Sequence, residues 1–181
     1  MKVYLHLAEG FEEIEALTVV DVLRRASINV ETVSISQSKE VNGAHNIKVF
    51  ADLLFEEANY NQCDMIVLPG GMPGTVHLEG HQGLIENIKQ FYNQGKWIAA
   101  ICAAPKILGN LGILSEKTAT CYPGFEKELK GAIMTDESVV QAGKIITSKG
   151  PGTAILFSLK IVDLLRGKEI AEEVKKNMMV G

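Results

Sequence analysis

Cysteine is scarce in this chain, which has only Cys63, Cys102 and Cys121 among its 181 residues. An odd number of widely spaced cysteines fits neither a disulfide framework nor a tetrahedral zinc site. His77 and His81 flank a predicted loop, and we assign no metal to them. The sequence therefore predicts free thiols in a reducing compartment and no bound metal.

Excess positive charge and long apolar runs are also missing. The 18 Lys and Arg residues are outnumbered by 22 Asp and Glu residues, which gives a formal net charge of -4. A chain without a basic footprint is a poor candidate for binding nucleic acid. No apolar run approaches the roughly 20 residues that cross a bilayer, and the first residues lack the features of a signal peptide. We therefore expect a cytoplasmic protein that contacts neither nucleic acid nor membrane.

Strands and helices alternate along the rest of the chain. Short runs typical of strands predict strands at 2–7, 30–35, 65–68, 97–101 and 118–120, and hairpins at 40–50 and 139–147. Helical spacing of apolar residues predicts helices at about 13–26, 84–92, 104–111, 153–166 and 168–175. This order predicts an α/β protein with a mostly parallel central sheet. The length and the 46% hydrophobic content fit a single domain, residues 1–181, with a sizeable core.

Cys102 stands at a sharp corner between the strand at 97–101 and the helix that begins near Pro105. Hydrolases place a serine at such a strand–nucleophile–helix elbow. A buried structural thiol is the alternative, because free cysteine is a common core residue. The helix start adds positive potential, so we expect a lowered pKa and a reactive thiolate.

Two other loops are predicted to end near this cysteine. Ligands of open parallel sheets bind beyond the carboxyl ends of the strands. Residues 10–15 and 70–74 follow the first and third of the predicted strands, and both loops contain glycine. By position alone, Glu12, Glu13 and Glu15 also fit a solvated first helical turn, and the glycines fit a simple turn. The spacing of these glycines does not match the dinucleotide fingerprint.

Four motifs in this order resemble the DJ-1/ThiJ/PfpI family. They are residues 8–15 (AEGFEEIE), 67–71 (VLPGG), 99–105 (AAICAAP) and 147–153 (TSKGPGT). The resemblance implies a flavodoxin-like three-layer α/β/α sandwich that forms a homodimer. We expect the dimer surface on the first helix and the 40–50 hairpin.

The resemblance also implies roles for particular residues. Cys102 is similar to the family nucleophile, and Glu15 to the acid facing it, with Glu12 as a structural cap. We expect a raised pKa for Glu15, so that its proton keeps Cys102 anionic. The backbone N–H groups of Gly71 and Ala103 are expected to bind an oxyanion. The expected pocket residues are Gly70, Tyr122 and Pro151.

The chain departs from its relatives at three places. Ala103 follows the cysteine where the peptidase branch has a histidine, so a proteolytic base is missing. Tyr122 stands where the human member has a histidine, and His45 where that member has an arginine. Cys121 is a weaker candidate for a resolving thiol.

The resemblance implies a cofactor-free enzyme acting on 2-oxoaldehydes. The expected activity is a glutathione-independent glyoxalase that makes lactate from methylglyoxal, or a deglycase acting on glycated side chains. A redox sensor or holding chaperone, working through oxidation of Cys102, remains an alternative. A third possibility is a flavodoxin-like protein that binds a nucleotide.

Overall fold

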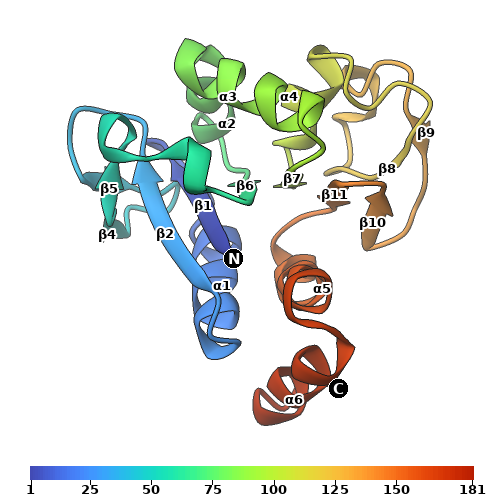
Figure 1. Ribbon diagram of the computed structural model, residues 1–181. Coiled ribbons are helices and arrows are strands. Elements are labelled where there is room, and N and C mark those ends of the chain that lie inside the picture. Colours follow the sequence, from blue (N-terminus) through green and yellow to red (C-terminus); the bar gives the residue numbers. More distant parts are fainter.

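A seven-stranded sheet forms the centre of the computed structural model, which describes residues 1–181 (Figure 1). The strand order is β10-β11-β7-β6-β1-β2-β5. The bounds are β1 (Lys2–Leu7), β2 (Asn29–Ser34), β5 (Leu53–Leu54), β6 (Met65–Leu68), β7 (Trp97–Ile101), β10 (Val139–Ala142) and β11 (Ile145–Ser148). Only β10 runs antiparallel to its neighbour. The predicted α/β class with a mostly parallel sheet is confirmed.

Helices cover both faces of this sheet and complete three layers (Figure 1). One side carries α1 (Glu13–Arg25), α5 (Ala154–Arg166) and α6 (Lys168–Asn177), and the other carries α2 (Gly74–Gly80), α3 (Gln82–Asn93) and α4 (Pro105–Asn110). Short 3-10 turns lie at η1 (Phe55–Glu57), η2 (Tyr60–Gln62), η3 (Glu126–Glu128) and η4 (Pro151–Thr153). No helix combines the length and the apolar character needed to cross a bilayer.

The central strands are apolar throughout because both of their faces are covered. On β6, Met65 and Val67 join the core beneath α1 and α5, whereas Ile66 and Leu68 join the core beneath α3 and α4. The same alternation holds on β7. This explains why residues 97–101 form a run without polar residues.

Two small sheets lie outside the central one. The antiparallel pair β3 (Glu40–Asn42) and β4 (Lys48–Phe50) confirms the predicted hairpin at 40–50. The other small sheet is the parallel pair of β8 (Thr118–Ala119) and β9 (Ile133–Met134), of which only β8 was predicted. The sequence also missed β5 and α2. The latter begins directly after a segment rich in Gly and Pro, which indicated only a loop.

The first helix, α1, has a broad apolar surface. Val19, Val20 and Leu23 are buried in the core shared with α5, but Ile14 is 56% exposed and Leu17 40% exposed. Part of the apolar surface of α1 therefore faces outward.

Replacing Phe157 by alanine tests the core on the α5 side. Phe157 is fully buried, and its neighbour Leu156 is 44% exposed. We expect Phe157→Ala to lower the free energy of unfolding by about 3–5 kcal/mol, because it removes a buried ring and leaves a cavity. Leu156→Ala should change it by less than about 1 kcal/mol. Equal losses in urea unfolding would contradict this packing.

Candidate active site

Cys102 occupies a strained backbone position between β7 and α4. Its φ of 65° lies in the left-handed region, which residues with a Cβ rarely adopt. Two backbone hydrogen bonds hold it there. The Cys102 N–H donates to the carbonyl of Ser148 (2.9 Å), and the Cys102 carbonyl accepts from the N–H of Tyr122 (2.8 Å). The structure therefore has the sharp elbow that the sequence indicated at this cysteine.

The carboxyl group of Glu15 is buried next to Cys102. Glu15 has no exposed surface, although it lies in the first turn of α1. Its Oε2 accepts a hydrogen bond from the N–H of Gly70 (2.7 Å), and its Oε1 is buried and has no hydrogen-bond partner. The carboxyl lies close enough to the Cys102 thiol for each group to shift the pKa of the other.

Gly70 is confined between these two groups. A methyl group added to it would lie 2.6 Å from Cβ of Cys102 and 2.8 Å from Oε2 of Glu15. Distances this short are incompatible with a side chain, so glycine is required for the two reactive groups to approach each other.

Two backbone N–H groups face the sulfur. The N–H groups of Gly71 and Ala103 both act on Cys102 in the direction that favours its anion. Neither N–H donates to a backbone carbonyl, so both remain available to a ligand. Such donors can stabilise negative charge that develops near the sulfur.

Burial raises the pKa of both acidic groups. It raises the pKa of Glu15 to about 7, while hydrogen bonds from Gly70 and Cys102 act in the opposite direction. It also raises the pKa of the Cys102 thiol, as does the neighbouring Glu15 carboxylate. The direction expected for Glu15 is therefore confirmed, but the lowered thiol pKa expected for Cys102 is wrong.

That error has a physical cause. Helix α4 has six residues and begins only at Pro105, so its dipole contributes little at the sulfur. Desolvation of the thiol outweighs the opposing effect of the two N–H groups. Ionisation of Glu15 thus makes the neighbouring thiol harder to ionise.

Tyr122 and the loop at 149–153 form the outer wall of the site. A cavity of about 190 Å³ lies between them and is lined by Tyr122 and Pro151. A methyl group added to Gly150 would lie 3.1 Å from the Tyr122 ring and 3.9 Å from the sulfur of Cys102. The sequence did not single out Gly150 or Ser148, although both lie in the quoted motif at 147–153.

The chain matches the DJ-1/PfpI family over residues 1–164. It belongs to this family. The match covers the elbow, the Gly70–Gly71 loop and the first turn of α1. The resemblance indicated by the sequence motifs is confirmed.

Named relatives have different lengths. "Protein DJ-1 homolog B" of Arabidopsis thaliana is 41% identical over 96% of this chain, which spans only 40% of that protein. "Glutathione-independent glyoxalase DJR-1.2" of Caenorhabditis elegans is 35% identical over 93% of this chain and 90% of its own length. The solved structure "Toxoplasma gondii DJ-1, oxidized" has a TM-score of 0.94 and 36% identity, and the alignment covers 98% of this chain and 97% of that chain. These matches support the flavodoxin-like fold expected for the DJ-1/PfpI family.

Glu12 was expected to cap α1 of this DJ-1/PfpI protein, but it does not do so through its side chain. It occupies the N-cap position but makes no side-chain capping bond. The neighbouring Glu13 is buried and binds His45, whose Nδ1 lies 2.8 Å from Oε2 of Glu13. Potential ligand atoms of Glu12, Glu13 and His45 lie within 4.8 Å of one another, but both oxygens of Glu13 already accept hydrogen bonds.

The other two cysteines lie in different surroundings. Cys63 and Cys121 are both buried, and burial raises the pKa of each thiol to about 11. Neither is in contact with a carboxyl group as Cys102 is. The resolving role suggested for Cys121 stays a prediction.

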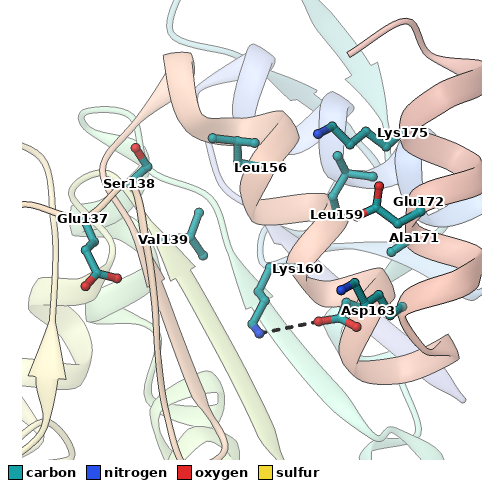
Figure 2. A pocket seen from close by; sticks show the side chains of 11 residues that line it. Glu137, Ser138, Val139, Leu156, Leu159, Lys160, Asp163, Ala171, Glu172 and Lys175 are labelled. Atoms are coloured by element: carbon teal, nitrogen blue, oxygen red, sulfur yellow. Dashed lines mark ion pairs between the residues drawn. The ribbon is translucent and has the colours of Figure 1, made fainter. Parts of the chain in front are cut away.

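The largest cavity of the molecule lies away from Cys102. It has a volume of about 640 Å³ between β10, α5 and α6 (Figure 2). Its walls include Val139, Leu156 and Leu159, together with the ion pair of Lys160 and Asp163 (3.5 Å). No cysteine or histidine lines this larger cavity.

Glu15→Gln tests where the charge of the pair resides. The amide removes the carboxylate that raises the Cys102 pKa, so the pH midpoint of Cys102 alkylation by iodoacetamide should fall by about 1–3 units. Mass spectrometry of the Cys102 peptide measures this midpoint. Asp21→Asn, which removes an exposed charge from the same helix, should leave it unchanged. A raised midpoint in Glu15→Gln would mean that Glu15 instead donates a proton to a thiolate.

Proposed function

We propose that this protein is a cysteine-dependent enzyme that acts on 2-oxoaldehydes without glutathione. The observation that carries the proposal is the buried contact between Glu15 and Cys102, with a carboxyl pKa of about 7. A base with this pKa is well suited to proton transfer near neutral pH. The name of the Caenorhabditis elegans relative, a glutathione-independent glyoxalase, supports the same activity.

In the first step, sulfur of Cys102 attacks the aldehyde carbon of methylglyoxal. A C–S bond forms, the carbonyl π bond breaks, and the thiol proton passes to the carboxylate of Glu15. The developing alkoxide is bound by the N–H groups of Gly71 and Ala103 and then takes up that proton from Glu15, which gives a hemithioacetal and returns Glu15 to its carboxylate form. Because the thiol loses its proton during attack, a permanently ionised cysteine is not required.

In the second step, Glu15 moves a proton from the former aldehyde carbon to the neighbouring carbon. The intermediate is an enediol, and the product is a thioester of lactate bound to Cys102. Water then cleaves the C–S bond, which releases lactate and restores the thiol. The aldehyde carbon of the substrate is oxidised while its neighbouring ketone carbon is reduced, so no external oxidant or reductant is needed.

A deglycase reaction would use the same groups. The substrate would then be the adduct of methylglyoxal on a Cys, Lys or Arg side chain. The cavity of about 190 Å³ beside Tyr122 and Pro151 is open to the surface and would admit such a side chain. Glyoxalase and deglycase activities thus differ in what enters this cavity.

Lactate formation from methylglyoxal without glutathione tests the proposal. Cys102→Ala should abolish it, because the nucleophile is lost. Glu15→Gln should lower kcat by about 10²–10⁴-fold, although its thiol pKa falls, because proton transfer is lost. Cys121→Ala is the matched control and should retain the wild-type rate.

Equal lactate from wild type and Cys102→Ala would contradict the enzyme proposal. The redox-sensor alternative predicts a different result. Without lactate formation, mild peroxide would add two oxygen atoms selectively to Cys102, as measured by mass spectrometry.

We also propose that the protein is a homodimer whose surface includes α1 and the β3–β4 hairpin. Ile47 and Phe50 of the hairpin are 52% and 72% exposed, and Ile14 and Leu17 on α1 are exposed as well. The hairpin lies against the start of α1 through the bridge between Phe11 and Gly43. Exposed apolar clusters of this kind are typical of protein interfaces.

Phe50→Glu should convert the dimer into a monomer, because it places a charge in the apolar contact. Sedimentation velocity measures the change in mass. Ile133→Glu is the control, since Ile133 is 59% exposed on β9, outside this surface. A monomeric wild type, or equal dissociation of both variants, would contradict the assignment.

A further inference from the structure

A buried hydroxyl group (Ser148) and a partly buried one (Thr153) connect the strand beside Cys102 to the loop that covers its sulfur. Ser148 ends β11 and has no exposed surface. Its Oγ lies 2.7 Å from Oγ1 of Thr153 and 2.7 Å from the carbonyl oxygen of Ser138. Oγ1 of Thr153 in turn accepts from the N–H of Gly150 (3.1 Å) and lies 2.9 Å from the carbonyl oxygen of the same residue.

Thr153 does not have the usual role of a threonine at its position. It is the N-cap residue of α5, where a threonine side chain normally accepts a hydrogen bond from the first turn of the helix. The Thr153 side chain makes no such bond. Its hydroxyl is turned instead toward Ser148 and Gly150, so its contribution is to the loop and not to the helix.

The hydroxyl protons can be arranged in two ways. Ser148 donates to the Ser138 carbonyl while Thr153 donates to Ser148, or Ser148 donates to Thr153 while Thr153 donates to the Gly150 carbonyl. In either arrangement, the carbonyl that receives no hydroxyl proton still accepts a backbone hydrogen bond. The donor is the Lys149 N–H for the Ser138 carbonyl and the Thr153 N–H for the Gly150 carbonyl. Both arrangements therefore hold the loop in the same place.

This loop holds the nucleophile from two directions. The Ser148 carbonyl accepts the hydrogen bond from the strained Cys102 N–H. Gly150 lies over the sulfur, since a methyl group added there would be 3.9 Å from it. We propose that Thr153 is a positioning residue, which acts through Ser148 and Gly150 to fix the loop over Cys102 and the geometry of the attacking sulfur.

The catalytic part of this inference rests on the proposed 2-oxoaldehyde chemistry, but the positioning itself is measurable without it. Thr153→Val keeps the shape of the side chain and removes the hydroxyl. The loop should then open more often, by about fivefold, the factor that corresponds to one net hydrogen bond. Alkylation of Cys102 by iodoacetamide at pH 9 should be faster by that factor.

Turnover of methylglyoxal should change in the opposite direction. With the loop displaced, kcat should fall by about tenfold, within the range that small misplacements of reacting groups cause, while KM changes little. Thr153→Ser restores the hydroxyl and should return both rates to the wild-type values. Ser158→Ala is the matched control, since it removes a buried hydroxyl that bonds only within α5 (to the Ala154 carbonyl, 2.7 Å).

The outcomes separate the two proposals. Faster alkylation in Thr153→Val, but not in Ser158→Ala, supports the positioning role even if the wild type makes no lactate. Wild-type alkylation and turnover in Thr153→Val would overturn it. Equal effects of Thr153→Val and Ser158→Ala would also overturn it, because they would indicate general loosening of α5.

Discussion

The hydrogen bond from the Cys102 N–H to the Ser148 carbonyl is the contact on which the site depends. It joins the end of β7 to the end of β11 and holds Cys102 in its left-handed conformation. A cysteine relaxed into ordinary strand geometry would direct its side chain into one of the two faces of the sheet. The strain at this residue is therefore what lifts the sulfur above the carboxyl ends of the strands.

The strand order explains why the other groups meet at this sulfur. β11, β7, β6 and β1 are consecutive in the sheet, and each is followed by one part of the site. Ser148 comes from β11, Cys102 from β7, Gly70 and Gly71 from the loop after β6, and Glu15 from the helix after β1. Because the four strands are parallel, these parts share one edge although the chain separates them by up to 133 positions, from 15 to 148.

The sequence predicted the parts of this arrangement that depend on local patterns. The apolar run at 97–101 and Pro105 were enough to place Cys102 at an elbow. The parallel order of strands brought the loop at 10–15 near it, but only the family resemblance singled out Glu15 within that loop. The direction of the thiol pKa was not predictable in this way, because it depends on how completely the folded chain removes water from Cys102. Gly150 and the hydroxyl pair of Ser148 and Thr153 were missed for a similar reason, since their contacts exist only once the loop closes over β11.

In the proposed reaction the proton transfers fall to Glu15, because no histidine lies at the sulfur. All four histidines are engaged elsewhere: His6 with Tyr60, His45 with Glu13, His77 with the Glu9 carbonyl and His81 with the Leu84 N–H. In the proposed reaction a single carboxyl group must then accept the thiol proton and later carry a proton between carbons. An ordinary carboxylate is too weak a base for both tasks, and burial is what raises the pKa of Glu15 to about 7. The same desolvation that makes the cysteine a poorer acid thus makes its neighbour a better base.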